Sequence, residues 1–209
     1  MASTKAAALS HDAMLAETAS FDKVPRILLH CCCAPCTSYV LEYLSSYFKI
    51  TLFYYNPNIQ PCEEYDRRAS ELQRLLELVS LPNKVDIIFG DYDDASFEAA
   101  TVLYRDEPEG SRRCRACFEL RLAETANQAK EGGFDYFTTT LSVSPHKDAV
   151  VLNEIGSRLA GEYGIKYLQS DFKKRDGYKR SIELSKQYGL YRQSYCGCER
   201  SKRTIDKLG

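Results

Sequence analysis

Near its start the chain reads Arg26-Ile27-Leu28-Leu29-His30-Cys31-Cys32-Cys33-Ala34-Pro35-Cys36, an apolar run followed at once by four closely spaced thiols. The apolar half is typical of a buried strand, which we expect over residues 26–31. Apolar residues then recur with helical spacing at Val40, Tyr43, Leu44 and Tyr47. The pattern predicts a strand that leads directly into a helix, with the thiols at the junction.

Apolar strands and helical patterns go on alternating along the chain. Further strands are expected over residues 50–55, 85–89, 136–140 and 166–168. Such alternation predicts an α/β fold, a Rossmann-like parallel sheet with helices on both faces. Ligands of such sheets bind at the carboxyl ends of the strands, where the first thiol run falls. Neither GxGxxG nor GxxxxGK[ST] occurs, so an ordinary dinucleotide or P-loop site has little support.

Local signals predict where some helices begin and end. Leu72, Leu75, Leu76 and Val79 make a second apolar stripe. Ser144 and Pro145 have the character of an N-cap and first turn, opening a helix that runs through Ile155 and Leu159. Gly132 and Gly133 are expected to close a helix that begins near Cys117.

The length of 209 residues suits one domain with terminal appendages. Residues 1–24 are rich in Ala and Ser and are expected to be a mobile N-terminal extension. The single α/β domain is expected over residues 25–209. No apolar run approaches the ~20 residues of a membrane span, so no membrane partner is expected.

The chain contains nine cysteines, yet residues 1–21 lack the apolar core of an export signal. We therefore expect a cytoplasmic protein without structural disulfides. In a reducing compartment, clustered cysteines more often bind metal or carry out redox chemistry.

Two further thiol clusters lie far from the first. Cys114 and Cys117 have the CxxC spacing that lets two sulfurs face one metal centre. With two thiols of the first run they would complete a four-sulfur site. Such sites take zinc or an iron-sulfur cluster, and the ligands alone do not separate the two.

The third cluster, Cys196-Gly197-Cys198, has a one-residue spacer that is too tight for a relaxed disulfide. A strained bond is easily reduced, which suits a thiol pair that cycles during turnover. The pair could instead bind a second metal, or be two idle thiols beside a glycine turn.

Cys33 and Cys36 also allow a thioredoxin-like interpretation, because they form a CxPC at a strand-to-helix junction. That interpretation leaves both distant clusters without a role. Cys31, Cys36 and Cys62 are expected to be packing residues. The lone histidines His30 and His146 are assigned no role.

Positive charge is concentrated at the end of the chain. Residues 171–209 hold eleven Lys/Arg and five Asp/Glu, although the net charge of the whole chain is −1. Interleaved tyrosines and cations suit unpaired RNA bases and phosphates. The candidate RNA-binding residues are Lys173, Lys174, Arg180 and Arg192. A solvated basic tail is the alternative.

These patterns together resemble the cobalamin-independent epoxyqueuosine reductases, the QueH family. The likeness runs from about residue 25 to residue 201. The matching blocks are His30 with Cys32-Cys33-Ala34-Pro35-Cys36, Tyr55-Asn56-Pro57-Asn58-Ile59, Arg113-Cys114 to Cys117 with Leu120-Arg121-Leu122, Ser144-Pro145-His146-Lys147, Asp171-Phe172-Lys173-Lys174, and Tyr195-Cys196-Gly197-Cys198.

The resemblance implies that residues 25–209 form one catalytic domain with a Rossmann-like (HUP-like) fold. This domain is implied to reduce epoxyqueuosine in the tRNA anticodon loop to queuosine, the last step of queuosine biosynthesis. It implies a 4Fe-4S cluster at the carboxyl ends of the strands, on Cys32, Cys33, Cys114 and Cys117, and an unidentified electron donor. Cys196 and Cys198 are implied to be the redox-active pair. An additional mononuclear iron is also implied, for which Asp91 and Asp171 are candidate ligands. The alternatives are a zinc-stabilised RNA-binding module and a thioredoxin-like thiol oxidoreductase.

Overall fold

The computed structural model describes residues 11–18 and 23–201 of the chain. Its strands pair in parallel as one five-stranded sheet, in the order β3-β2-β1-β4-β5. Each predicted strand is confirmed to within one residue at either end. The strands are β1 (Arg26–His30), β2 (Lys49–Tyr54), β3 (Asp86–Phe89), β4 (Tyr136–Thr139) and β5 (Lys166–Tyr167).

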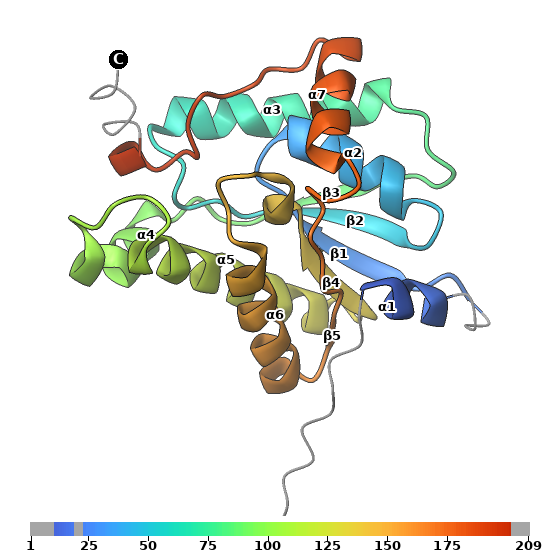
Figure 1. Ribbon diagram of the computed structural model, residues 1–209, viewed down its shortest axis with the longest axis horizontal. Helices are drawn as coiled ribbons and strands as arrows, with labels where there is room; N and C mark the ends of the chain where they lie inside the picture. The colour runs from blue at the N-terminus through green and yellow to red at the C-terminus, as the bar shows by residue number, and fades with distance from the viewer. Residues whose placement is uncertain (1–10, 19–22, 202–209) are drawn as a thin grey trace, which may run out of the picture.

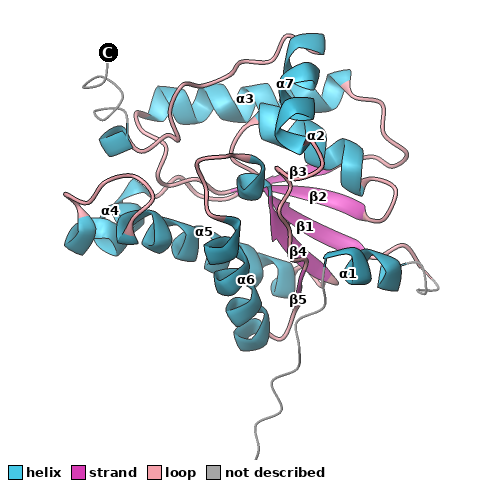
Figure 2. Ribbon diagram, viewed as in Figure 1, coloured by secondary structure: helices cyan, strands magenta, loops and turns pink. Residues whose placement is uncertain are grey.

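Helices cover both faces of this sheet, as predicted (Figure 1). One layer consists of α2 (Ala34–Leu44), α3 (Cys62–Leu78) and α7 (Gly177–Gln187), and the other contains α5 (Arg112–Glu131) and α6 (Ala149–Tyr163). Figure 2 shows the strands as a single layer between them. Alternating residues of β1 face opposite sides, so Ile27 and Leu29 enter one apolar core while Leu28 enters the other. Among the described residues, no helix has the length and apolar character needed to cross a bilayer.

The order of the strands creates a gap at the carboxyl edge of the sheet. Strand β1 pairs with β2 on one side and with β4 on the other. The chain leaves β1 toward α2 in one helical layer and leaves β4 toward α6 in the other. Connections that diverge in this way open a crevice at the switch point, where ligands of parallel sheets bind. Cys31, Cys32 and Cys33 follow β1 directly into this region.

The prediction that Ser144 opens a helix is wrong. Residues Thr140–Val143 form a 3-10 helix, η2, and Ser144 is its C-cap. Helix α6 begins later, because the carboxylate of Asp148 accepts hydrogen bonds from the backbone N–H groups of Val150 and Val151. Residues 144–148 therefore form a loop above the carboxyl edge of the sheet.

Helix α5 begins earlier than predicted. Ser111 is its N-cap, so Cys114 and Cys117 both lie within the helix, three residues apart on one face. Its predicted end is confirmed, since Gly132 is the C-cap. Before α5 the chain forms the short helices α4 (Asp94–Thr101) and η1 (Val102–Tyr104).

Part of the expected N-terminal extension is structured. Residues His11–Thr18 form helix α1, which buries Leu15 in the core beside α2. Asp12 of this helix forms an ion pair with Arg175 at 2.7 Å. This part of the extension therefore packs against the domain, whereas residues 1–10 and 19–22 lie outside the described ranges.

Gly156 gives a test of the packing between α6 and β5. A Cβ atom there would lie 2.3 Å from Cζ of Tyr167, whereas one at Gly161 of the same helix would meet nothing within 4 Å. We expect Gly156→Ala to lower the free energy of unfolding by about 1–3 kcal/mol through overpacking. Gly161→Ala should raise it by about 0.5–1 kcal/mol, because alanine favours the helix. Chemical denaturation measures both, and stabilisation by both variants would contradict the packing.

Candidate metal and thiol site

Cysteines from all three clusters line two adjoining cavities at the carboxyl edge of the sheet. The first, about 340 Å³, has the thiols Cys114, Cys117, Cys196 and Cys198 on its wall. The second, about 360 Å³, has Cys32, Cys33, Cys36 and Cys196. The residues that line both cavities are Glu109, His146, Lys147 and Cys196. The fold thus brings together thiols from three distant parts of the sequence.

The first thiol run divides between the core and the second cavity. Cys31 is fully buried, and its Sγ lies 3.5 Å from the backbone oxygen of Phe53. Burial above all raises its pKa well above the ordinary value, so it packs as a neutral thiol. Cys32 and Cys33 line the cavity with their Sγ atoms 3.9 Å apart. Cys36, expected to pack, also reaches the second cavity.

The first two turns of α5 supply the second pair of thiols. Gly110 donates its backbone N–H to Sγ of Cys114 at 3.2 Å. Cys117 is buried, and burial raises its pKa to about 11 although the Arg121 guanidinium lowers it in part. Both thiols lie near the positive end of the helix, which favours negative charge there.

A buried arginine on α3 holds the third pair in place. Arg68 is only 1% exposed. Its guanidinium donates to the backbone oxygens of Tyr195 and Cys196 at 3.3 and 3.2 Å, and to the carboxylate of Glu64 at 2.7 Å. The carbonyl of Gly197 accepts from Gln60 N–H at 2.9 Å. These contacts fix the backbone of the CxC loop beside the loop that follows β2.

The segment that carries the CxC, residues 188–198, runs along α3 and is called here the C-terminal strap. Arg74 donates to the carbonyl of Gly189 at 2.6 Å, and Glu71 accepts the N–H of Tyr191 at 2.7 Å. Glu64 accepts the hydroxyl of Tyr191. Polar side chains spaced along one face of α3 therefore anchor the strap at several points.

Gly197 is required where the strap meets the loop after β2. Its φ of +113° lies in a region that side chains rarely adopt. A Cβ atom would also lie 2.7 Å from Cγ1 of Ile59. The residue between the two thiols is thus set by backbone conformation and by close packing.

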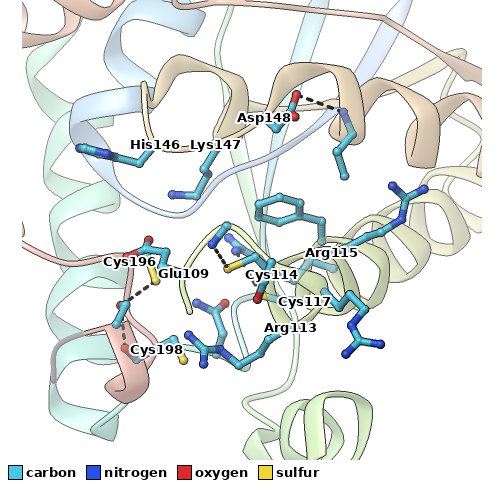
Figure 3. A pocket seen from close by; sticks show the side chains of 18 of the residues that line it. Glu109, Arg113, Cys114, Arg115, Cys117, His146, Lys147, Asp148, Cys196 and Cys198 are labelled. Atoms are coloured by element: carbon cyan, nitrogen blue, oxygen red, sulfur yellow. Dashed lines mark hydrogen bonds between the residues drawn. The ribbon is translucent and has the colours of Figure 1, made fainter. Parts of the chain in front are cut away.

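Lysine 147 places positive charge between the two cavities. Figure 3 shows its amine extending from the 144–148 loop toward the thiol side of the first cavity. Burial disfavours the charge of Lys147, but Cys32, Cys196 and Cys36 outweigh this effect and raise its pKa. The side chain therefore stays protonated beside the thiols.

The remaining candidate residues are placed differently from one another. Asp91 and Asp171 line neither thiol cavity, and Asp171 forms ion pairs with Lys173 and Lys174 at 2.8 and 3.4 Å. Arg180 is paired with Glu42 and Glu183. Arg192, in contrast, lines the second cavity.

Several residues of the site belong to blocks that match the family but were assigned no role from the sequence. Lys147 and His146 line both cavities because α6 begins after them, which the expected helix start concealed. Arg121 lies four residues after Cys117, so helical spacing could have placed both on one face. Asn58 lines the first cavity with its Oδ1 buried and without a hydrogen-bond partner.

The fit of these residues to a metal centre depends on their donor chemistry. Within residues 11–18 and 23–201, no three His, Cys, Asp or Glu side chains are grouped closely enough to hold a metal ion. The thiols instead stand in sets on the walls of the two cavities, with the cations Arg121 and Lys147 among them. Sulfur donors beside positive charge suit an anionic thiolate metal centre, either zinc or an iron-sulfur cluster.

Comparison with known proteins gives one consistent family. The family model described as "Epoxyqueuosine reductase QueH" matches residues 27–204, which include all three thiol clusters. A protein of that name from Streptococcus pyogenes serotype M1 is 45% identical over 176 residues, covering 83% of this chain and 69% of its own length. Another from Staphylococcus epidermidis is 45% identical over 180 residues, covering 83% and 75%. One from Thermotoga maritima is 35% identical over 178 residues, covering 82% and 88%. The chain belongs to the epoxyqueuosine reductase QueH family.

Proposed function

We propose that this chain reduces epoxyqueuosine in the tRNA anticodon loop to queuosine, releasing the epoxide oxygen as water. Membership of the family supports the reaction. The observation that carries it is the meeting of three thiol clusters around two cavities that share Cys196. Such a site can bring electron-donating groups to a substrate held at the sheet edge.

Cys32, Cys33, Cys114 and Cys117 are proposed to hold a 4Fe-4S cluster, and the reaction is proposed to need no cobalamin. When bound, such a cluster supplies electrons one at a time. The protein buries Cys32, Cys33 and Cys117 and places the charge of Lys147 beside the thiols.

Cys196 and Cys198 are proposed as the redox-active pair. Removing an epoxide oxygen as water takes two electrons and two protons, and oxidation of two thiols to a disulfide releases two of each. The external electron donor, not yet identified, then reduces the disulfide. Binding of an additional mononuclear iron is the other role open to this pair. The positions of Asp91 and Asp171 outside both cavities do not favour them as ligands of that iron.

The structure does not favour a thioredoxin-like reaction at Cys33. A nucleophilic cysteine of that class has a lowered pKa. The neighbouring Cys32 lowers the pKa of Cys33, but the hydrogen bond with Cys36 and burial outweigh it and raise the value to about 11. Cys33 therefore lacks the lowered pKa that such a nucleophile needs.

The tRNA is proposed to approach the second cavity. Tyr178, Tyr195 and Arg192 line it, which combines aromatic faces with a cation. Arg192 is exposed and donates to the hydroxyl of Ser185 at 3.1 Å. Its charge is available to a phosphate, whereas carboxylates already neutralise Lys173, Lys174 and Arg180.

A direct assay tests the reaction and the role of the CxC together. Epoxyqueuosine-containing tRNA is incubated with protein and a chemical reductant, digested, and queuosine is measured by mass spectrometry. We expect the wild-type chain to form queuosine and Cys196→Ser to lose turnover while keeping its iron. Cys62→Ser, at an exposed thiol outside both cavities, is the control that should retain activity. Normal turnover by Cys196→Ser would exclude a redox role for the CxC.

The metal content tests the proposed cluster. After anaerobic purification, the wild-type protein should contain iron and acid-labile sulfide and be brown. Cys114→Ser should lose most of the cluster, because a four-cysteine site then lacks one ligand. Cys62→Ser should retain it. A colourless zinc protein would instead support the zinc-stabilised RNA-binding module.

Charge reversal at the cavity rim tests the tRNA site. We expect Arg192→Glu to weaken tRNA binding and to lower the slope of log K against log salt by about 1, the effect of one lost phosphate contact. Arg180→Glu, at a guanidinium already paired with Glu42 and Glu183, should have a smaller effect. Filter-binding titrations at several salt concentrations measure both variants, and an equal effect of the two would argue against this cavity as the RNA site.

A further inference from the structure

Arg121 on α5 is a buried cation in contact with the thiol site. It is 2% exposed. Its Nη2 donates to Oδ1 of Asn56 at 2.5 Å, Nη1 lies 3.9 Å from Sγ of Cys117, and Nε lies 3.3 Å from Nε2 of His30. A guanidinium is always charged in proteins. A full positive charge is therefore fixed inside the molecule, next to a proposed metal ligand.

The described residues give Arg121 no carboxylate partner. Arg68 is also a buried arginine, but it differs from Arg121 because it binds the carboxylate of Glu64 at 2.7 Å. The neighbours of Arg121 are instead an amide, an imidazole and a thiol. His30 cannot supply a compensating negative charge, because an imidazole ring is either neutral or cationic. A buried charge without a counter-ion is costly, so an anion is required nearby.

Cys117 is the sulfur ligand in contact with Arg121, with its Sγ 3.9 Å from Nη1, and both residues line the first cavity. Cys114 lines the same cavity from the same helix. Arg121 therefore lies beside the pair of thiols that α5 contributes to the proposed cluster.

We propose that Arg121 is a positioning residue that acts as the counter-charge of the anionic centre held beside Cys117 and raises the reduction potential of that centre. This inference rests on the proposed function for the identity of that centre. Asn56 sets the direction of the guanidinium, because it accepts from Nη2 and donates its own N–H to the carbonyl of Cys31 at 2.9 Å. A cation held in this way lowers the energy of each added electron.

The alternative is a purely structural role, in which Arg121 only ties α5 to the end of β1 and to the loop after β2. The two roles differ in the protein without its cluster. If Arg121 is mainly structural, its removal destabilises the protein in every state. If it is a counter-charge, the apoprotein contains an uncompensated buried cation, and replacement by a neutral side chain of similar length relieves it.

The experiment compares Arg121→Met and Arg121→Lys with the wild-type chain, each as apoprotein and after anaerobic reconstitution with iron and sulfide. Apo Arg121→Met should unfold at the same or a higher temperature than the wild-type apoprotein. After reconstitution, it should lose iron to a chelator about tenfold faster, as is typical when an outer-shell partner of a metal site is removed. Its midpoint potential should be more negative, and Arg121→Lys should restore the potential in part.

The control is Arg158→Met on α6, where the arginine is half-exposed and pairs with Glu119 and Glu162. Its midpoint potential should equal that of the wild type. An unchanged potential in Arg121→Met, or an apo variant that unfolds at a lower temperature than the wild type, would overturn the proposal. Failure of the wild-type chain to take up iron and sulfide would instead reject the proposed cluster, while apoprotein stability would still decide whether the charge of Arg121 is uncompensated.

Discussion

The pairing of β1 with both β2 and β4 is the constraint on which the site depends. Because β1 lies at the point where the order of strands reverses, the connections after β1 and β4 pass to opposite helical layers. The space left between them receives the first thiol run, the 144–148 loop and the first turn of α5. Hydrogen bonds from buried polar side chains then hold the loops that line this space. Arg68 is the main example, since it binds two carbonyls of the strap and a carboxylate of its own helix.

Much of the fold could be predicted from the sequence because apolar runs and helical spacing are local signals. The strands and the end of α5 are confirmed, whereas the start of α6 was placed too early. Ser144 and Asp148 are both good N-caps, and only the folded chain decides between them. The helical spacing of apolar residues also included Tyr47, but this residue lies past the end of α2. The chain turns after Leu44 to enter β2.

The candidate site was harder to predict, because charge and thiol content do not reveal partners. Lys173 and Arg180 look alike in the sequence to Arg192, but carboxylates bind the first two. Cys31 and Cys36 likewise had the same expected packing role in the sequence. In the structure, Cys31 packs in the core while Cys36 reaches a cavity. Spacing identified the groups that could take part in chemistry. Which of them face a common space depends on contacts between residues far apart in the sequence.

The docking of the strap along α3 has a consequence for the assembly of the protein. Synthesis proceeds from the N-terminus. All five strands, and Cys114 and Cys117 of α5, therefore leave the ribosome before residues 188–198 do. The walls carrying Cys32 and Cys114 can therefore form around a space that is still open on the side later closed by Cys196. Cys196 and Cys198 are therefore the last thiols to join the site.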